Sequence, residues 1–417
     1  MGVLEDADRL WRGELSVEDV HPLAGSGQLV EVADGVAFLH GFGNVTAITA
    51  GDGLVLVDTG PPPAAQWIHQ TVRSWTPNRL QAAVYTHGHI DHVFGVGPFE
   101  EESASNGWAA PRVVAHENVP ARFDRYRMTG GFNALINRRQ FGAPGLDWPT
   151  EYRYPDQTYY DAYDLEVGGD LIELRHAKGE TDDATWVWVP GRRVLCTGDL
   201  FVWCTPNAGN PQKVQRYPAE WAEALRRMSA FGAEVLLPGH GWPIVGADRV
   251  KEALARTAEL LESLLVQTIA VMNAGGRLDQ ALHSVTVPDR LAGLPYLQPV
   301  YDEPEFIVRT VWRRYGGWYD GNPANLKPAP EADLAAELAS LAGGAGRLAE
   351  RAKELADGGD LRVAGHLAET ARLAAPDDPQ VLTAHAEVYG KRAESERSTM
   401  AKGIFNWAAE ESQPPTG

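Results

Sequence analysis

Short apolar runs alternate with amphipathic stretches along residues 30–250 of this 417-residue chain. The runs have the length of β-strands and many end in Gly or Asp, which favour turns. They are residues 30–40, 45–60, 80–86, 112–117, 171–176, 185–190, 193–199 and 233–240. Two stretches with helical spacing, 61–76 and 217–232, lie between them. The pattern therefore predicts an α/β domain over residues 30–250.

Helical periodicity dominates after residue 250. A long helix is predicted over residues 248–276, and a segment rich in Pro and aromatic residues continues to residue 330. Residues 331–411 are rich in Ala, Leu and Glu and contain several Gly and Pro stops, which predicts short antiparallel helices. We expect a helical connector over 251–330, a separate helical domain over 331–411, an N-terminal extension over 1–29 and a disordered tail over 412–417.

Composition and charge narrow the functional classes. Hydrophobic residues make up 44% of the chain and charged residues 22%, as in ordinary globular proteins. The formal net charge of −19 argues against nucleic acid or anionic lipid as a partner. We expect no membrane span and a cytoplasmic protein, because long apolar stretches and a signal-peptide core are absent from the sequence. Cys196 ends an apolar run and is expected to be a buried thiol.

Three of the 12 histidines fall between residues 87 and 92. His87 and His89 follow the predicted strand 80–86 directly, and alternate residues leaving a strand point to one side, so both can bind one metal ion. Asp91 and His92 lie beyond the turn and can face a second ion. Imidazole and carboxylate ligands suit zinc, while iron and manganese stay open. The alternative is a solvated polar loop with no metal.

Two further ligand candidates follow later strands. Asp199 comes directly after the apolar run 193–198, and His240 ends the run 233–240. Taken singly, they could be a turn aspartate and a loop histidine. Together with the first cluster they predict two metal ions that share Asp199.

The ordered motifs VDTG, THGHIDH, TGDLF and PGHGW resemble those of the metallo-β-lactamase fold. The resemblance implies an αββα sandwich with a dinuclear site at one edge and with Asp58 supporting it from behind. Most of that superfamily has a histidine about 20 residues before the bridging aspartate, and here Glu180 stands at that place. The alternatives to Glu180 as a ligand are His176, Asp182 and Asp183.

A glutamate at this position resembles the ligand pattern of the zinc alkylsulfatases, which are a branch of the same fold. Residues 113–119, 137–145 and especially 309–330 also resemble segments of that family. The resemblance identifies residues 331–411 with the dimerisation domain and implies a homodimer. Family members usually continue into a lipid-carrier-like domain, which we expect this chain to lack.

The resemblance implies a dinuclear zinc hydrolase, with two Zn²⁺ per chain, that cleaves an alkyl sulfate ester with an apolar alkyl part by attack of a metal-bound hydroxide. Asp91 and Asp199 would be catalytic ligands. Arg216 matches an arginine of the family, and Trp203 and Tyr159 are candidates to bind the alkyl chain. A lactone, carboxylic ester or phosphate ester is the alternative substrate, and a non-catalytic binding protein is the alternative class. A second family arginine has no counterpart here, which leaves sulfate specificity open.

The net charge of the metal ions and their ligands determines how strongly such a site attracts an anionic substrate. Two zinc ions carry +4, the carboxylates of Asp91, Glu180 and Asp199 carry −3, and a bridging hydroxide carries −1. Since the core is then neutral, an anionic substrate would need nearby cations. The candidates are Arg216, Lys213, Lys178, Arg138 and Arg139.

Overall fold

The computed structural model describes residues 2–413 and divides the chain into two compact units. Of the described residues, the first unit comprises 2–130 and 149–317, and the second comprises 131–148 and 318–413. The first unit thus contains most of the segment expected to be a connector, while residues 131–148 group with the C-terminal helices. Of the predicted disordered tail, residues 414–417 lie outside the described part of the chain.

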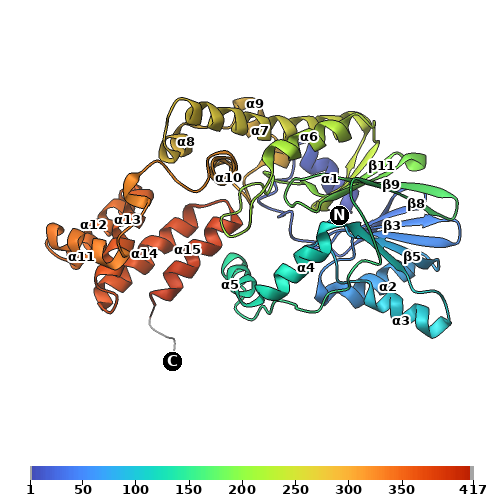
Figure 1. Cartoon of the computed structure of the whole chain (residues 1–417), viewed down its shortest axis with the longest axis horizontal. Coiled ribbons are helices and arrows are strands. Elements are labelled where there is room, and N and C mark those ends of the chain that lie inside the picture. The colour runs from blue at the N-terminus through green and yellow to red at the C-terminus, as the bar shows by residue number, and fades with distance from the viewer. Residues whose placement is uncertain (1, 414–417) are drawn as a thin grey trace. The chain divides into compact units, whose positions relative to one another are not determined.

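The first unit is built on two sheets (Figure 1). One has seven strands in the order β1-β2-β3-β4-β5-β6-β7, and the other has six in the order β13-β12-β11-β10-β9-β8. The pairs β4–β5, β5–β6, β6–β7 and β11–β12 are parallel and the rest are antiparallel. The strands are β1 Leu29–Ala33, β2 Val36–Leu39, β3 Val45–Ala50, β4 Gly53–Val57, β5 Arg79–Val84, β6 Arg112–His116, β7 Gln157–Tyr159, β8 Ala162–Val167, β9 Asp170–His176, β10 Thr185–Val189, β11 Val194–Val202, β12 Val235–His240 and β13 Ile244–Val245.

Strand β4 shows why the runs are apolar without interruption. Its side chains alternate between the two faces of the sheet. Val55 and Val57 face the core shared with the second sheet, while Leu54 and Leu56 pack with helix α2 (Ala65–Trp75). Both faces are buried, so neither can carry polar residues. Helices α2 and α3 (Gly97–Asn106) cover the first sheet, and α6 (Pro218–Ser229) and α7 (Ala247–Asn273) cover the second, which confirms the predicted αββα sandwich (Figure 1).

The helices of the first unit include several that the pattern did not indicate. Its helices are α1 Val3–Trp11, α2 Ala65–Trp75, α3 Gly97–Asn106, α4 Asn118–Met128, α6 Pro218–Ser229, α7 Ala247–Asn273, α8 Leu278–Ser284, α9 Asp289–Ala292 and α10 Pro304–Gly316. Helices α2, α6 and α7 were predicted, whereas α1, α3 and α4 were not. The signal for α1 was present, because Val3, Ala7 and Leu10 are buried at helical spacing. Strands β7, β8 and β13 were also missed, being short or mixed in polarity.

The second unit is helical, as predicted for its C-terminal part. It contains α5 Gly130–Phe141, α11 Glu331–Ala342, α12 Ala345–Asp357, α13 Leu361–Ala374, α14 Pro379–Ser395 and α15 Thr399–Glu411. Its cores are small and rich in Ala, which lets the helices approach closely. Helix α5 packs on α15, where the Arg139 guanidinium lies 5.4 Å from the centre of the Trp407 ring. Within residues 2–413, the helices are too short or too polar to cross a bilayer.

Candidate metal centre

The metal-ligand candidates converge from strands β11 and β12, the loop that follows β5 and the loop that follows β9. Asp58 follows β4, and residues 86–92 follow its parallel neighbour β5, so both segments leave the same edge of the first sheet. In the second sheet, Asp199 was predicted to follow its strand but lies within it, because β11 continues to Val202. His240 ends β12, where it pairs with Val202. Gly239 allows this approach, because a Cβ atom there would lie 2.0 Å from Asp199 Oδ1. Segments far apart in sequence thus bring their polar ends to one place.

One group of ligand atoms comes from His87, His89, Glu180 and Asp199. His87 Nε2 lies 2.9 Å from His89 Nδ1, 3.6 Å from Glu180 Oε2 and 3.7 Å from Asp199 Oδ2. His89 Nδ1 lies 3.4 Å from Glu180 Oε2. These atoms surround one point, as the ligands of a single ion do.

A second group comes from Asp91, His92 and His240. Asp91 Oδ2 lies 3.6 Å from His92 Nε2 and 3.4 Å from His240 Nε2. Asp199 reaches this group too, since Oδ1 lies 3.5 Å from His92 Nε2 and Oδ2 lies 3.3 Å from His240 Nε2. Asp199 is therefore positioned between the two groups.

These residues fit divalent transition metals. Two ligand atoms held at about 2.1 Å from one zinc ion in tetrahedral geometry are about 3.4 Å apart, and most separations in both groups are close to that value. His92 Nε2, Glu180 Oε2 and Asp199 Oδ1 are buried, and the described residues offer them no hydrogen-bond partner. Unsatisfied buried polar atoms are costly, and a bound cation would satisfy all three.

Neighbouring groups orient the imidazoles. Asp58 Oδ2 accepts hydrogen bonds from His92 Nδ1 at 2.8 Å and from the Thr86 hydroxyl at 2.8 Å, while Oδ1 accepts from the Thr86 amide at 2.7 Å. His240 Nδ1 donates to the carbonyl oxygen of Phe42. Asp58 itself has φ of 60°, an uncommon value for a residue other than glycine. These contacts leave the Nε2 atoms of His92 and His240 directed at the ligand group.

Glu180 is held from two sides. The Asn207 amide donates to its Oε1 atom, and Arg216 Nη1 lies 3.3 Å from the same oxygen. Arg216 also donates to the Glu180 carbonyl oxygen. Because Oε1 is occupied in this way, Oε2 faces the imidazoles of His87 and His89.

The three alternatives to Glu180 have other contacts. Arg122 is buried and donates to Asp183 at 2.5 Å and to Asp182. The His176 ring stacks on His116 with 3.7 Å between ring centres, and its Nδ1 donates to a carbonyl oxygen at 2.9 Å. The described ligand groups include Glu180 and none of these three.

Burial and mutual charge set the ionisation of the ligands. Burial lowers the pKa of His87 well below its ordinary value, and repulsion from His92 and His89 lowers it further, so the ring is neutral and able to bind a metal. Burial alone would raise the pKa of Asp199. The imidazoles of His240 and His92 outweigh that effect and hold this pKa well below its ordinary value. Asp199 is therefore an anion.

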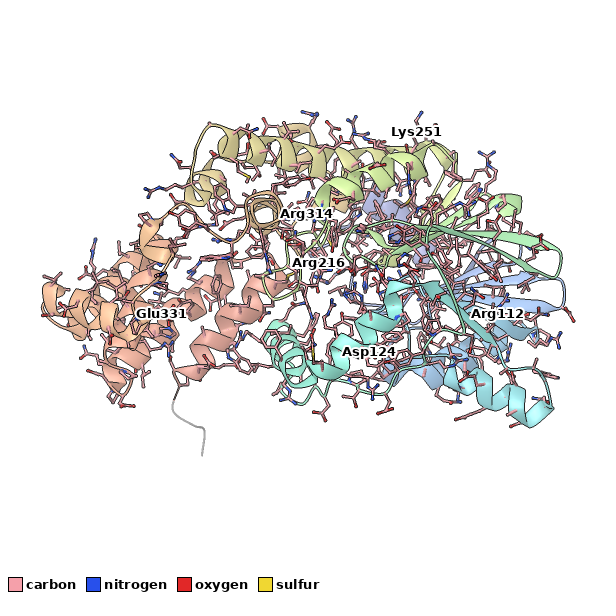
Figure 2. All side chains as sticks on the ribbon, in the orientation of Figure 1. Arg112, Asp124, Arg216, Lys251, Arg314 and Glu331 are labelled. Carbon is pink, nitrogen blue, oxygen red and sulfur yellow. The ribbon has the colours of Figure 1, made fainter. Side chains whose placement is uncertain are left out.

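The residues predicted to bind substrate lie in different surroundings. Arg216, labelled in Figure 2, is buried, with 2% exposure. Its Nη1 atom lies 3.3 Å from the Glu180 carboxylate. Tyr159 packs in the main core, and its hydroxyl lies 2.6 Å from the Thr185 hydroxyl. Trp203 is fully buried and donates to the Trp242 carbonyl oxygen. Their predicted roles in binding stay predictions.

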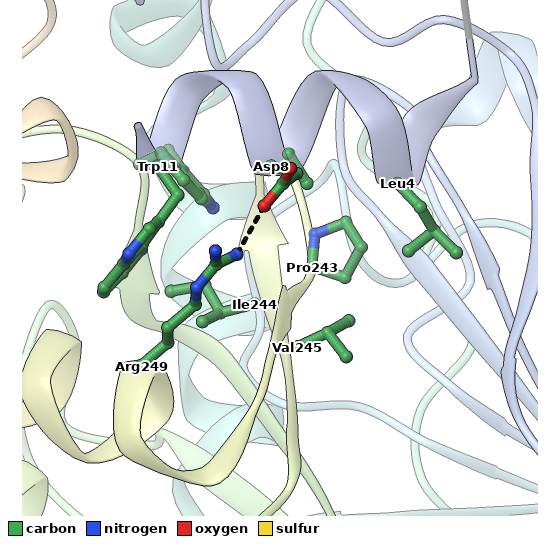
Figure 3. A pocket seen from close by; sticks show the side chains of 9 residues that line it. Leu4, Asp8, Trp11, Pro243, Ile244, Val245 and Arg249 are labelled. Carbon is green, nitrogen blue, oxygen red and sulfur yellow. Dashed lines mark hydrogen bonds and ion pairs between the residues drawn. The ribbon is translucent and has the colours of Figure 1, made fainter. Parts of the chain in front are cut away.

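Trp203 also lines a pocket of about 250 Å³ between α1 and β13 (Figure 3). The pocket is largely apolar and contains the ion pair Asp8–Arg249, with 2.8 Å between the charged atoms. The Arg249 guanidinium also lies over the Trp11 ring. The described contacts of Trp203 therefore lie in the core and along this pocket.

The other candidate cations have mixed positions. Burial lowers the pKa of Lys213 to about 8, and repulsion from Arg216 adds to this, whereas attraction to Glu180 and Asp91 opposes it. Lys213 therefore lies in the field of both ligand groups. Lys178 lies over the Tyr217 ring, with its Nζ 5.6 Å from the ring centre. Arg138 and Arg139 belong to the second unit, where Arg138 pairs with Asp147 at 3.0 Å.

Asn207 and Arg122 are among the supporting residues that sequence reasoning missed. Asn207 donates to Glu180, and Arg122 joins α4 to the loop that follows β9. Asn207 stands in a loop without regular structure, where no pattern marks it. Arg122 had a weak signal, as a charged residue on the apolar side of a helix whose Val119, Phe123 and Tyr126 are buried.

Comparisons with known proteins agree with this architecture. Residues 40–240 match the metallo-beta-lactamase superfamily, and residues 277–414 match the family described as alkyl sulfatase dimerisation. The chain is 30% identical over 341 residues to a linear primary-alkylsulfatase of Pseudomonas sp. (strain ATCC 19151), which covers 76% of this chain and 63% of that protein. It is 28% identical over 352 residues to an (R)-specific secondary-alkylsulfatase of Pseudomonas sp., covering 78% of this chain and 53% of the relative. The chain thus spans less than two thirds of the length of either relative.

A solved structure shares the fold of nearly the whole chain. The stereoselective inverting sec-alkylsulfatase Pisa1 from Pseudomonas sp. matches with a TM-score of 0.84 and 23% identity, covering 93% of this chain and 66% of that protein. The comparisons confirm the predicted combination of a metallo-β-lactamase sandwich with a helical dimerisation region. Residues 40–240 therefore form a domain of the metallo-β-lactamase superfamily, and residues 277–414 belong to the alkyl sulfatase dimerisation family.

Proposed function

We propose that this chain is a dinuclear zinc hydrolase that cleaves an alkyl sulfate ester. The observation that carries the proposal is the convergence of seven ligand residues in two groups that share Asp199. Relatives named as alkylsulfatases support the substrate class, and the nitrogen and carboxylate ligands support zinc. Bound there, two zinc ions would supply Lewis-acid polarisation and hydroxide at neutral pH.

Arg216 changes the charge balance of the site. Glu180 adds one negative charge relative to the histidine that is usual at this place in the superfamily. The Arg216 guanidinium contacts the Glu180 carboxylate at 3.3 Å and offsets that charge inside the protein. With Lys213 in the same field, the region around the two ligand groups becomes favourable for an anionic ester.

The exposure of the ligands indicates the side from which substrate enters. His89 and Asp91 keep 16% and 18% of their side-chain surface exposed, whereas Glu180 and Asp199 keep 3% and 9%. Substrate would therefore reach the site across His89 and Asp91. The buried ring of Tyr126 lies 6.4 Å from that of His89 and supports this ligand from the protein side.

The helical second unit would join two copies of the chain. Leu334, Leu338 and Leu341 lie on one face of α11 at helical spacing, with 57%, 42% and 85% of their surface exposed. An apolar stripe of this kind is unfavourable in water and favours association. Together with the match to the dimerisation family, it supports a homodimer.

A substrate screen tests the proposed reaction. Purified, zinc-loaded protein would be incubated with alkyl sulfates of increasing chain length, and with lactones, carboxylic esters and phosphate esters. We expect release of inorganic sulfate from the alkyl sulfates, with a His89→Ala variant as the inactive control. Cleavage of neutral esters without any release of sulfate would refute the sulfatase assignment and leave a metallohydrolase of another substrate class.

A further inference from the structure

The two residues that hold Glu180 belong to one irregular loop. Residues 203–217 connect β11 to α6 without regular secondary structure. Asn207 and Arg216 stand near the two ends of this loop and both contact Glu180. Because the loop has no strand or helix partners of its own, its anchoring determines whether Asn207 can reach Glu180.

The anchor lies almost a hundred residues later in the chain, within the first unit. Residues 297–310 form three sets of hydrogen bonds to the loop. The Thr205 hydroxyl donates to the Leu297 carbonyl oxygen at 2.8 Å, and the Thr205 amide donates to the Gln298 carbonyl oxygen at 3.0 Å. The Thr310 hydroxyl donates to the Gly209 carbonyl oxygen at 3.0 Å.

Asp302 is the centre of this anchor. Its Oδ2 atom accepts from the amides of Gly209 at 2.6 Å and Asn210 at 3.2 Å, and its Oδ1 atom accepts from the Glu303 amide at 2.7 Å. The side chain is fully buried. A buried carboxylate is costly unless hydrogen bonds satisfy both oxygens, so Asp302 favours one backbone geometry of residues 209 and 210.

The geometry that Asp302 stabilises is unusual. Asn210 has φ of 20°, which is rare for a residue other than glycine. A Cβ atom on Gly209 would lie 2.4 Å from Phe306 Cβ, so the loop touches α10 directly at this glycine. This close contact restricts the backbone of the loop. Losing Asp302 would remove the hydrogen bonds that stabilise the unusual conformation at Asn210.

We propose that Asp302 is a positioning residue of the metal centre, which acts through the loop 203–217 by holding Asn207 against Glu180. The inference rests on the proposed metal centre, because Glu180 must be a ligand for its orientation to matter. Asp302 lies in the part of the chain that matches the dimerisation family. That region thus contributes to the metal site, and its removal would disturb catalysis even if the sandwich still folded.

The variant Asp302→Asn tests the inference in the full chain. An asparagine has one oxygen acceptor, and its NH₂ group would face an amide donor, so the loop should loosen while the volume of the side chain is kept. We expect affinity for the ion bound by Glu180 to fall about 10- to 100-fold, as for other residues that orient metal ligands. Cobalt(II) absorption can show which of the two sites loses its ion. The His89→Ala variant provides the reference spectrum of protein that lacks the ion bound by Glu180. Amide exchange should rise at residues 207–213.

Two further variants separate positioning from loss of stability. Leu261→Ala removes a fully buried side chain from α7 and should lower the melting temperature at least as much as Asp302→Asn, while both metal affinities stay unchanged. Asn207→Ala should lower the affinity for the same ion as Asp302→Asn does. The double variant should lower this affinity little further than either single change.

Wild-type affinity for both ions in Asp302→Asn would overturn the inference, as would an equal loss of metal in Leu261→Ala. These readouts do not depend on the substrate. If the wild-type chain binds metal but releases no sulfate, the proposed reaction is refuted and the inference about Asp302 is unaffected. A wild-type chain that binds no metal through Glu180 would end both.

Discussion

Removing the Glu180 side chain should destabilise the protein even when no metal is bound. The reason is Arg216, which has 2% of its surface exposed and has the Glu180 carboxylate 3.3 Å from its Nη1 atom. In Glu180→Ala the guanidinium would stay buried without this counter-charge. Breaking one side of a buried ion pair costs about 3–5 kcal/mol. Since Arg216 keeps its hydrogen bond to the backbone carbonyl oxygen of residue 180, we expect a value near the lower limit.

The assay is urea unfolding of metal-free protein in the presence of a chelator, so that loss of metal does not contribute. The transition of the first unit can be followed through its buried tryptophans, Trp186, Trp203 and Trp221. Glu180→Gln is the matched variant, because it keeps an oxygen acceptor for Asn207 and removes only the charge. Adding Arg216→Met to Glu180→Ala should restore most of the lost stability, since replacing both members of a buried pair is often neutral.

The refuting results are specific. The reasoning fails if metal-free Glu180→Ala unfolds within about 0.5 kcal/mol of wild type, the range of an ordinary surface substitution. It fails as well if the double variant is no more stable than the single one. In zinc-loaded protein the same substitution should also lower the metal content by one ion per chain, which elemental analysis would detect.

Three further outcomes are expected. Elemental analysis of loaded wild-type protein should find about two zinc ions per chain, and one ion or fewer would contradict the shared role of Asp199. Asp58→Asn removes the carboxylate that accepts from His92 Nδ1 and should weaken metal binding about 10- to 100-fold in a chelator competition, with Asp52→Asn as a control at an exposed position. Glu369 accepts a hydrogen bond from His385, and this bond lowers the pKa of Glu369 to about 2. Burial of the carboxyl raises this pKa, but Arg372 lowers it further. Because this pKa lies below the ordinary value of 4.5, the stabilisation is present above about pH 4.5 and is lost as the pH falls toward 2. The melting temperature of Glu369→Gln should therefore depend less on pH in that window than the melting temperature of wild type. Equal dependence on pH would refute this account.

The proposed dimer can be tested on α11. Replacing Leu334, Leu338 and Leu341 with Glu should give monomers in light scattering at micromolar concentration, because buried carboxylates would be unpaired in the interface. Ala336→Glu, an exposed position on another face of the same helix, should leave the mass unchanged. A wild-type chain that is monomeric under these conditions would refute the proposal.

Local pattern alone was enough to predict the strands that carry the site. An apolar run followed by a polar turn marks the end of a buried strand, and the ends of parallel neighbours meet at one edge of a sheet. For this reason His87, His89, Asp91, His92 and His240 could be named from their positions at or after the ends of such runs. Asp199 was named from the same pattern, although its strand β11 continues to Val202. The same pattern indicated the helical C-terminal region, and it predicted the buried thiol of Cys196, which is free in the structure.

Contacts between distant segments decided the rest. Among the acidic residues near 180, local sequence could not separate a ligand from its neighbours. The structure distinguishes them because Arg122, from α4, binds Asp182 and Asp183, while Glu180 faces His87 and His89. Likewise no local signal joins Asp302 to Gly209, or places residues 131–148 with the C-terminal helices. Sequence patterns report which side of a strand or helix is buried, whereas the partner that a loop finds depends on the packing of the whole chain.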